Sequence, residues 1–242
     1  MIRETLLAVA LAGLVAALAL TVMQISWVTP LILKAETFED AAATQPHAHA
    51  SAHEHEHAHQ HAHEHGAEEW KPHDGLQRTL FTFAANILMG FAYGFMLVAV
   101  YLLWREPASA GSGALYGLAG FVAFFVAPSL GLPPELPGTA AAELSERQLW
   151  WTMIAVTTGA GLLVLFSRAS VLSRVLGAAL IAVPHLIAAP QPEAHASLAP
   201  EDLQTQFRVA SALSNAVFWI LLGLASSYAF RKWVGAHVRR DT

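Results

Sequence analysis

The chain has 242 residues, of which 55% are hydrophobic and 13% are charged, and its formal net charge is −5. Soluble domains carry about 25% charged residues, so this composition excludes an ordinary soluble fold and indicates a protein that crosses a membrane. The chain has no cysteine, which excludes disulfides and thiolate metal sites and leaves histidine, carboxylate and amide side chains as candidate metal ligands.

Six apolar segments approach or exceed the roughly 20 residues that a membrane-spanning helix needs. They cover residues 5–28, 79–104, 112–130, 149–167, 171–189 and 207–230. The third and fifth are short, and each contains a proline, which membrane helices tolerate where neighbouring helices satisfy the freed backbone groups. The sequence therefore predicts an all-α, polytopic membrane helix bundle of about six spans.

The first apolar segment is longer than the roughly 7–15 apolar residues of a signal peptide, and the residues before it are barely positive. We therefore expect a retained first transmembrane helix within residues 1–33. An extracytoplasmic, histidine-rich loop is expected to follow over residues 34–77. Residues 78–242 are then expected to form a five-span bundle with a short cytoplasmic tail.

Nine histidines crowd the expected loop, and from residue 53 to residue 65 every second residue is one. They are His47, His49, His53, His55, His57, His59, His61, His63 and His65. Neutral imidazole is a common ligand of divalent first-row metals, whereas this polar composition cannot build a core. We expect a disordered segment that collects divalent ions without selecting among them, and whose capture weakens below a pH of about 6.5. The alternative is a solvated low-complexity loop that binds nothing.

Charge indicates the orientation of the six expected spans. Basic residues dominate the termini and the second and fourth connections, whereas the other side holds most of the carboxylates. Because cytoplasmic loops carry an excess of arginine and lysine, both termini are expected in the cytoplasm and the histidine segment outside. The acidic outer surface would attract cations.

A weak repeat links the helices that follow the outer loops. Gln77, Gln148 and Gln206 are each followed nine residues later by a polar residue, namely Asn86, Thr157 and Asn215. This spacing favours three related helix hairpins, an organisation common in transporters. With so few matching positions, chance remains the alternative explanation.

The outer loops also carry candidate ligands, namely Glu36, Glu135, Glu193 and His195. Three similar hairpins around one axis would bring the three carboxylates together, and oxygen ligands with one histidine suit a borderline divalent ion. Alternatively, these are exposed carboxylates that favour the starts of the following helices. His185 follows a proline at membrane depth and is either an inner metal ligand or a structural hydrogen-bonding group.

The sequence lacks the short motifs of several enzyme classes. It contains no phosphate-binding Gly-x-x-x-x-Gly-Lys-Ser/Thr, no His-Glu-x-x-His and no Gly-x-Ser-x-Gly. We expect neither an enzyme, nor a tightly bound cofactor, nor a nucleic-acid partner. Transport energy would come from a partner or from the membrane potential.

Several motifs resemble the CbtA family of cobalt transporter subunits. They are residues 1–7 (MIRETLL), 30–39 (PLILKAETFE), 130–138 (LGLPPELPG), 147–151 (RQLWW) and 184–195 (PHLIAAPQPEAH). The resemblance covers nearly the whole chain. It implies cobalt (Co²⁺) uptake across the bacterial inner membrane in connection with cobalamin biosynthesis, and a small, histidine-bearing, single-span membrane partner of the CbtB type. The family has about five spans, against the six expected here.

The sequence thus predicts a subunit of a divalent transition-metal uptake transporter. The histidine segment would collect the ion, and Glu36, Glu135, Glu193 and His195 would pass it towards His185. The alternatives are a nickel or zinc transporter, or a non-transporting metal-binding membrane protein such as a sensor or metal chaperone. Homo-oligomerisation is left open.

Overall fold

The computed structural model describes residues 2–44, 72–104, 108–167 and 170–235, and these residues are helical apart from turns and loops. Their only extended pairing is an isolated antiparallel bridge between Thr139 and Ser197. The expected all-α fold is confirmed for these parts of the chain. The predicted histidine segment, residues 47–65, lies outside them.

The first helix is longer than the sequence analysis expected. It runs without a break from Ile2 to Ala43, as α1 (Ile2–Met23), the π-helical turn η1 (Gln24–Val28) and α2 (Thr29–Ala43). Pro30 sits in the first turn of α2, where its missing N–H is tolerated. The expected loop from residue 34 is therefore helical as far as Ala43. The whole helix is about 63 Å long, about twice the hydrocarbon thickness of a bilayer.

The middle of the chain forms α3 (Leu76–Trp104) and α4 (Ala110–Phe121), followed by the π-helical turn η2 (Val122–Val126) and α5 (Ala127–Ser129). Ser109 caps α4 by accepting a hydrogen bond from the Ser112 backbone N–H at 3.1 Å. η2 precedes Pro128 by the same offset as η1 precedes Pro30. In both helices the proline lies just beyond a π turn.

The last third comprises α6 (Leu144–Phe166), α7 (Val171–Ala182) with the 3-10 turn η3 (Val183–Leu186), and α8 (Glu201–Ala229) with η4 (Phe230–Val234). Five of the described helices are long and apolar enough to span a membrane, and Val171–Leu186 is shorter. The fifth expected span, residues 171–189, is thus a helix that falls short of the usual length of a membrane-spanning helix.

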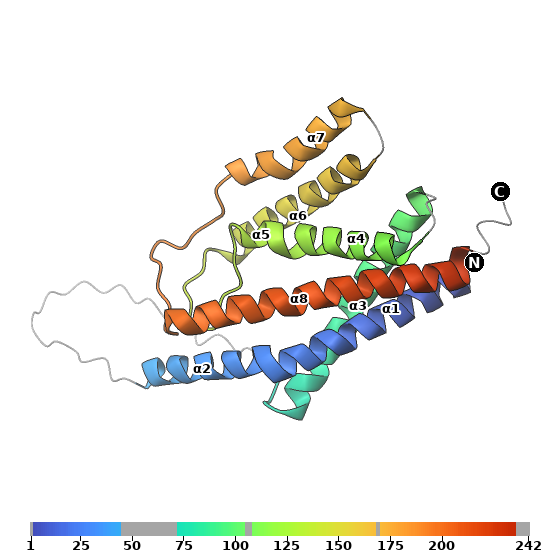
Figure 1. Cartoon of the computed structure of the whole chain (residues 1–242). Helices are drawn as coiled ribbons and strands as arrows, with labels where there is room; N and C mark the ends of the chain where they lie inside the picture. Colours follow the sequence, from blue (N-terminus) through green and yellow to red (C-terminus); the bar gives the residue numbers. More distant parts are fainter. Residues whose placement is uncertain (1, 45–71, 105–107, 168–169, 236–242) are drawn as a thin grey trace, which may run out of the picture.

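α7 nevertheless runs back beside α6, so the start of α1 and the end of α8 lie at the same end of the molecule (Figure 1). We call this the termini end. The opposite end holds α2, residues 130–143 and residues 187–200, and we call it the loop end. Apart from Glu4, every described carboxylate belongs to an element at the loop end.

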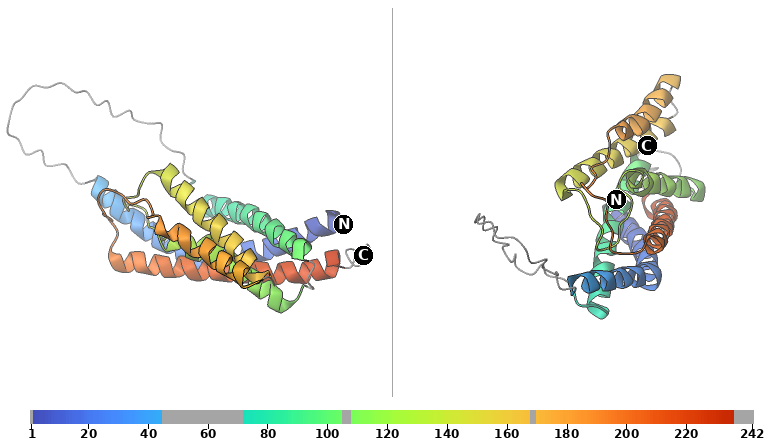
Figure 2. Two further views of the ribbon diagram at one scale, coloured as in Figure 1. Left: turned by 90° about the horizontal axis from the view of Figure 1, so that it is seen from above. Right: turned by 90° about the vertical axis from the view of Figure 1, so that its left-hand side faces the viewer.

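Four helices form the core. α1 packs against α3 and α8, and α4 packs against the other side of α8, whereas α6 packs mainly against α7. The α6–α7 hairpin stands beside this core and joins it through a small cluster around Ala127, Trp150 and Ile154 (Figure 2). Of the three predicted hairpins, only α1–α3 packs as expected, because α4 pairs with α8 and α7 with α6.

Glycines allow these pairs of helices to approach closely. A Cβ atom at Gly90 would lie 2.6 Å from the Gly13 carbonyl oxygen, and one at Gly161 would lie 2.7 Å from that of Gly177. Gly223 meets the Gly113 carbonyl in the same way. The pairs α1–α3, α6–α7 and α4–α8 therefore each contain a contact that a larger residue would push apart.

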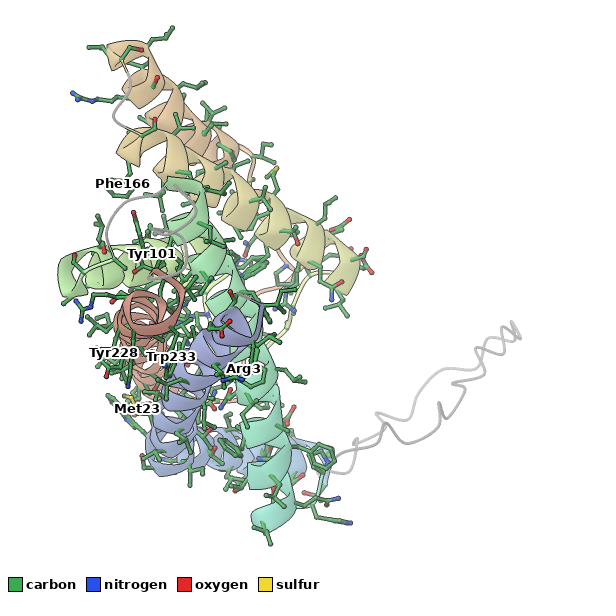
Figure 3. All side chains as sticks on the ribbon, turned by 90° about the vertical axis from the view of Figure 1, so that its right-hand side faces the viewer. Arg3, Met23, Tyr101, Phe166, Tyr228 and Trp233 are labelled. Atoms are coloured by element: carbon green, nitrogen blue, oxygen red, sulfur yellow. The ribbon has the colours of Figure 1, made fainter. Side chains whose placement is uncertain are left out.

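Aromatic side chains close the core at the termini end. The ring of Tyr101 stacks on that of Phe230 with centroids 5.2 Å apart, and Lys232 Nζ lies 5.4 Å from the Trp233 ring centroid. Figure 3 shows Trp233 and Arg3 by the ends of α8 and α1, with Tyr101 of α3 and Phe166 of α6 above them.

Candidate functional site

The candidate site lies at the loop end, on an apolar base formed by α2 and α8. Val28 and Ala35 of the first long helix pack with Leu203 and Phe207 of α8, and Leu136 from the loop before α6 joins them. These side chains are at least nine-tenths buried. The base fixes residues 130–143 against the start of α8.

A buried amide then joins the two loops to each other. The Gln204 side chain is 5% exposed; its Nε2 donates to Thr139 Oγ1 at 2.7 Å and to Ser197 Oγ at 2.9 Å. Its Oε1 accepts from the Leu136 backbone N–H at 3.2 Å. Gln204 therefore links both loops to the first turn of α8.

Backbone contacts beside Gln204 hold the same two loops together. The Ala140 N–H donates to the Ala196 carbonyl at 2.9 Å, and the Leu198 N–H donates to the Gly138 carbonyl at 3.0 Å. Gly138 has a φ of +75°, a conformation that favours glycine. The position of residues 130–143 relative to residues 187–200 is thus defined by hydrogen bonds at Gly138 and Ala140.

Glu135 and His195 come together in an open pocket between these loops and α8. This pocket, of about 470 Å³, is also lined by Gln191, Glu201 and Arg208, and we call it the α8 pocket. A second pocket, of about 550 Å³, lies against the start of α6, and we call it the α6 pocket. Its lining includes Glu135, Phe124, Ser129, Arg147, Gln148, Trp151 and Thr152. Glu135 belongs to both pockets.

Two of the predicted carboxylates form ion pairs with arginines at the starts of helices. Glu36 Oε1 lies 2.8 Å from Arg78 Nη2, and Asp74 Oδ1 lies 3.2 Å from Arg78 Nε. Glu135 Oε2 lies 3.5 Å from Arg147 Nη2. Glu36 thus belongs to a junction between α2 and the start of α3, whereas Glu135 makes a looser contact with α6.

The other predicted ligands lie apart. Glu193 is exposed two residues before His195 and lines neither pocket. The His185 ring packs edge-on against Trp150, with centroids 6.2 Å apart, and lines neither pocket. Within the described ranges, no three histidine or carboxylate side chains lie close enough to hold one metal ion. The structure therefore places Glu135 and His195 on the lining of one pocket, but it does not gather the four outer groups into one centre.

Polar side chains at membrane depth bond to neighbouring helices or to their own helix. Asn86 donates to Thr21 Oγ1 at 2.9 Å and to Gln24 Oε1 at 2.6 Å, which joins α3 to α1 and η1. Asn215 and Thr157 each donate to a carbonyl four residues earlier in their own helices. These contacts are those of packing groups within a membrane bundle.

The electrostatics of the loop end favour cations. Glu143 caps α6, and hydrogen bonds from the Ser145 side chain and backbone lower the pKa of its carboxyl group. Glu146 in the same turn and Glu201 and Asp202 in the first turn of α8 add further acidic groups. Arg147 and Arg208 are the basic groups among these carboxylates and line the two pockets.

Sequence reasoning missed Gln204, Arg147 and Arg208. Gln204 had a usable signal, because it lies next to Leu203 and three residues before Phe207, at the edge of the apolar stripe of α8. The arginines had a weaker one. Each lies within two residues of a glutamine of the predicted repeat, but a lone arginine at a helix start is usually a solvated group.

A family model described as "Probable cobalt transporter subunit (CbtA)" matches residues 2–231. No curated protein and no solved structure matches the chain. The match includes α1 to α8 and both loops of the candidate site, and it agrees with a membrane protein of five candidate spans. The chain belongs to the CbtA family of probable cobalt transporter subunits.

Proposed function

We propose that this protein is the membrane subunit of a Co²⁺ uptake transporter, and that Glu135 and His195 form a transient metal site in the α8 pocket. The observation that carries the proposal is their convergence: two different loops, joined through Gln204, bring a carboxylate and an imidazole to one open pocket. The family of the chain names cobalt as the transported ion.

The donor set suits an ion that must be released again. A carboxylate oxygen and an imidazole nitrogen suit Co²⁺, Ni²⁺ and Zn²⁺, and without thiolates they bind less tightly than a cysteine site. Two protein ligands leave the remaining coordination positions to water. Glu201 lines the same pocket and adds negative charge near the ion.

The remaining predicted ligands fit around this site. The histidines of residues 47–65 would collect metal near the loop end. Their segment follows Thr44, at the end of α2, and precedes Pro72, before α3. Glu193, exposed beside His195, would meet the ion before it enters the pocket. His185 would act deeper in the bundle, and we assign Glu36 to the α2–α3 junction because Arg78 already holds it.

Orientation and partners complete the proposal. Arg3, Arg174, Arg231 and Lys232 belong to elements at the termini end, and the positive-inside rule places that end in the cytoplasm of a bacterial inner membrane. The loop end would then face outward. A transporter subunit requires other subunits, and a small, histidine-bearing, single-span protein of the CbtB type is the partner that we propose.

A second candidate function is a metal-binding membrane protein that does not transport. The favouring observation is an apolar groove of about 190 Å³ that shares Phe124 with the α6 pocket and runs along α6 to Phe166. Tyr116 is the polar side chain in its lining, which otherwise consists of apolar residues and glycines. Such a lining offers an ion little to replace its hydration shell.

Uptake of radiolabelled cobalt tests the two candidates. Cells that express the chain with its proposed partner are compared with a Glu135→Gln, His195→Ala double variant and a deletion of residues 47–65. We expect the double variant to lower the initial rate at least about tenfold at an equal membrane level. The deletion should raise the cobalt concentration needed for half-maximal uptake, because it removes only the collector.

The control is Asp202→Asn, which removes an exposed carboxylate from the first turn of α8 outside the pocket. It should transport like the parent chain. Unchanged uptake by the double variant would reject the Glu135–His195 site. Binding without any uptake by the parent chain and its partner would favour the second candidate.

A further inference from the structure

Glu135 lies on a wall shared by two pockets. It lines the α8 pocket together with His195, and it lines the α6 pocket together with Arg147. Its side chain is 26% exposed and that of Arg147 is 32% exposed. The carboxylate is therefore accessible to a metal ion on one side and to a guanidinium on the other.

The contact between Glu135 and Arg147 is loose. The two charged atoms are 3.5 Å apart, whereas charge-assisted N–H···O bonds are typically about 2.7–2.9 Å long. Partly exposed ion pairs contribute little to stability. Another cation can therefore replace Arg147 at small cost.

The Glu36–Arg78 pair at the same end provides the contrast. Arg78 Nη2 donates a hydrogen bond to Glu36 Oε1 at 2.8 Å, and Arg78 has a second acidic partner in Asp74 at 3.2 Å. Glu36 is not a lining residue of either pocket. One arginine is thus fixed between two helices, whereas the other faces a pocket into which it can move.

We propose that Arg147 is the counter-cation of Glu135 in the metal-free protein, and that a divalent ion entering the α8 pocket displaces it. This inference rests on the proposed function, which makes Glu135 a metal ligand. A divalent ion beside Glu135 would repel the guanidinium, because like charges a few ångströms apart interact unfavourably at a partly screened surface. Arg147 would then turn into the α6 pocket, where Gln148, Thr152 and Ser129 provide oxygen acceptors.

The exchange gives the site two properties. A monovalent cation gains little by replacing a guanidinium of equal charge, so the competition favours divalent ions. The returning arginine also helps the ion to leave, because it restores a partner to Glu135. Arg147 is in this sense a positioning residue that sets the affinity and the charge selectivity of the site without contacting the ion.

Equilibrium binding of Co²⁺ tests the exchange. The full-length chain is placed in nanodiscs with the nine histidines of residues 47–65 replaced by serine, so that the collector does not contribute to the signal. Removing the competing charge with Arg147→Gln should tighten the dissociation constant by about fivefold. Arg147→Lys keeps a cation and should stay within about twofold of the parent, and Arg147→Met, which keeps the apolar stem, should reproduce the glutamine variant.

Arg78→Gln is the matched control, since it removes an arginine of the same end that is held in the other ion pair. It should leave the dissociation constant within about twofold of the parent. Glu135→Gln should weaken binding at least about tenfold, and adding Arg147→Gln to it should restore nothing, because the arginine acts only through that carboxylate.

The outcomes separate the two claims. If Glu135→Gln binds cobalt like the parent, the proposed site itself is rejected. If Glu135→Gln weakens binding but neither Arg147→Gln nor Arg147→Met tightens it, the site stands and the exchange is wrong. Equal tightening by Arg78→Gln would also overturn the exchange, because the effect would then be the general loss of a positive charge.

Discussion

At the residue scale, the loop end depends on the buried amide of Gln204. This side chain hydrogen-bonds to Thr139 and to Ser197, and it accepts from the Leu136 N–H. Buried polar groups that lose their partners cost more than the net value of the bonds themselves. The positions of the loops that carry Glu135 and His195 therefore depend on one residue of α8, whose hydrogen bonds go to Leu136, Thr139 and Ser197.

Replacing Gln204 with leucine should expose this dependence. Gln204→Leu leaves the Leu136 N–H without its acceptor and removes the amide donor from the Thr139 and Ser197 hydroxyls, and we expect it to lower the free energy of unfolding by about 1–3 kcal/mol. The measurement is thermal or denaturant unfolding in detergent. Gln206→Leu alters an exposed glutamine two residues away and should change stability little; equal losses in both variants would contradict the assignment.

The sequence identified only part of the site at this scale. Glu135 and His195 were predicted because three similar hairpins would bring the outer carboxylates together, and because oxygen ligands with one histidine suit a borderline divalent ion. Gln206 was selected in place of Gln204, since the repeat depended on spacing and carried no information about burial. Arg147 was not predicted as the partner of Glu135, because a pairing across twelve residues and a turn depends on tertiary structure.

At the scale of elements, close packing at glycines sets the helix pairs. Gly161 and Gly177 meet between α6 and α7, whereas a Cβ at Gly159, two residues earlier on the same helix, would meet nothing within 4 Å. The two glycines of α6 therefore provide a comparison in which helix propensity is matched and packing differs.

We expect Gly161→Ala to destabilise the α6–α7 hairpin by about 1–3 kcal/mol, because the added methyl group would lie 2.7 Å from the Gly177 carbonyl oxygen. Gly159→Ala should be neutral or stabilising by up to about 1 kcal/mol, since alanine favours helix more than glycine. Unfolding of the two variants in the same detergent compares them. A similar loss of stability in both would show that glycine packing does not hold this pair.

Elements were predicted better than their partners. The apolar runs located the described helices, but the segment with Lys34, Glu36 and Glu39 was read as a loop because its charges exclude it from the membrane. It is helical because it packs on α8, with Ala35 buried, Lys34 exposed and Glu36 paired with Arg78 of α3. The predicted hairpins paired α4 with α6 and α7 with α8. In the structure, the close contacts at glycines instead join α4 to α8 and α6 to α7.

At the scale of the whole molecule, the path of α7 decides the topology. Val171–Leu186 is shorter than a usual membrane-spanning helix. It nevertheless returns the chain to the loop end, where α8 begins (Figure 1). Hydropathy counts whole spans and cannot decide this case, because a short helix can cross where the bilayer thins or flanking residues extend to the interface.

Labelling of single cysteines measures the crossing directly, since the chain has no cysteine of its own. We expect Ala141→Cys and Ala194→Cys, both exposed at the loop end, to react in intact cells with a reagent that cannot cross the membrane. Ser170→Cys, exposed at the start of α7, should react only after permeabilisation. If Ala194→Cys behaves like Ser170→Cys, α7 does not cross and the two loops of the site lie on opposite sides.

The two π turns also bear on how this family can vary. Each turn closes a wider ring than an α-helical turn, so it holds the equivalent of one inserted residue. Deleting one codon within residues 24–28 would therefore restore a regular helix and leave Glu36 facing Arg78, whereas the same deletion within the regular α-helical part of α1 would rotate everything beyond it by about 100°. The turn between Met23 and Pro30 is thus a place where the chain can lose one residue and still present the same face of α2 to α8, which a regular helix does not allow.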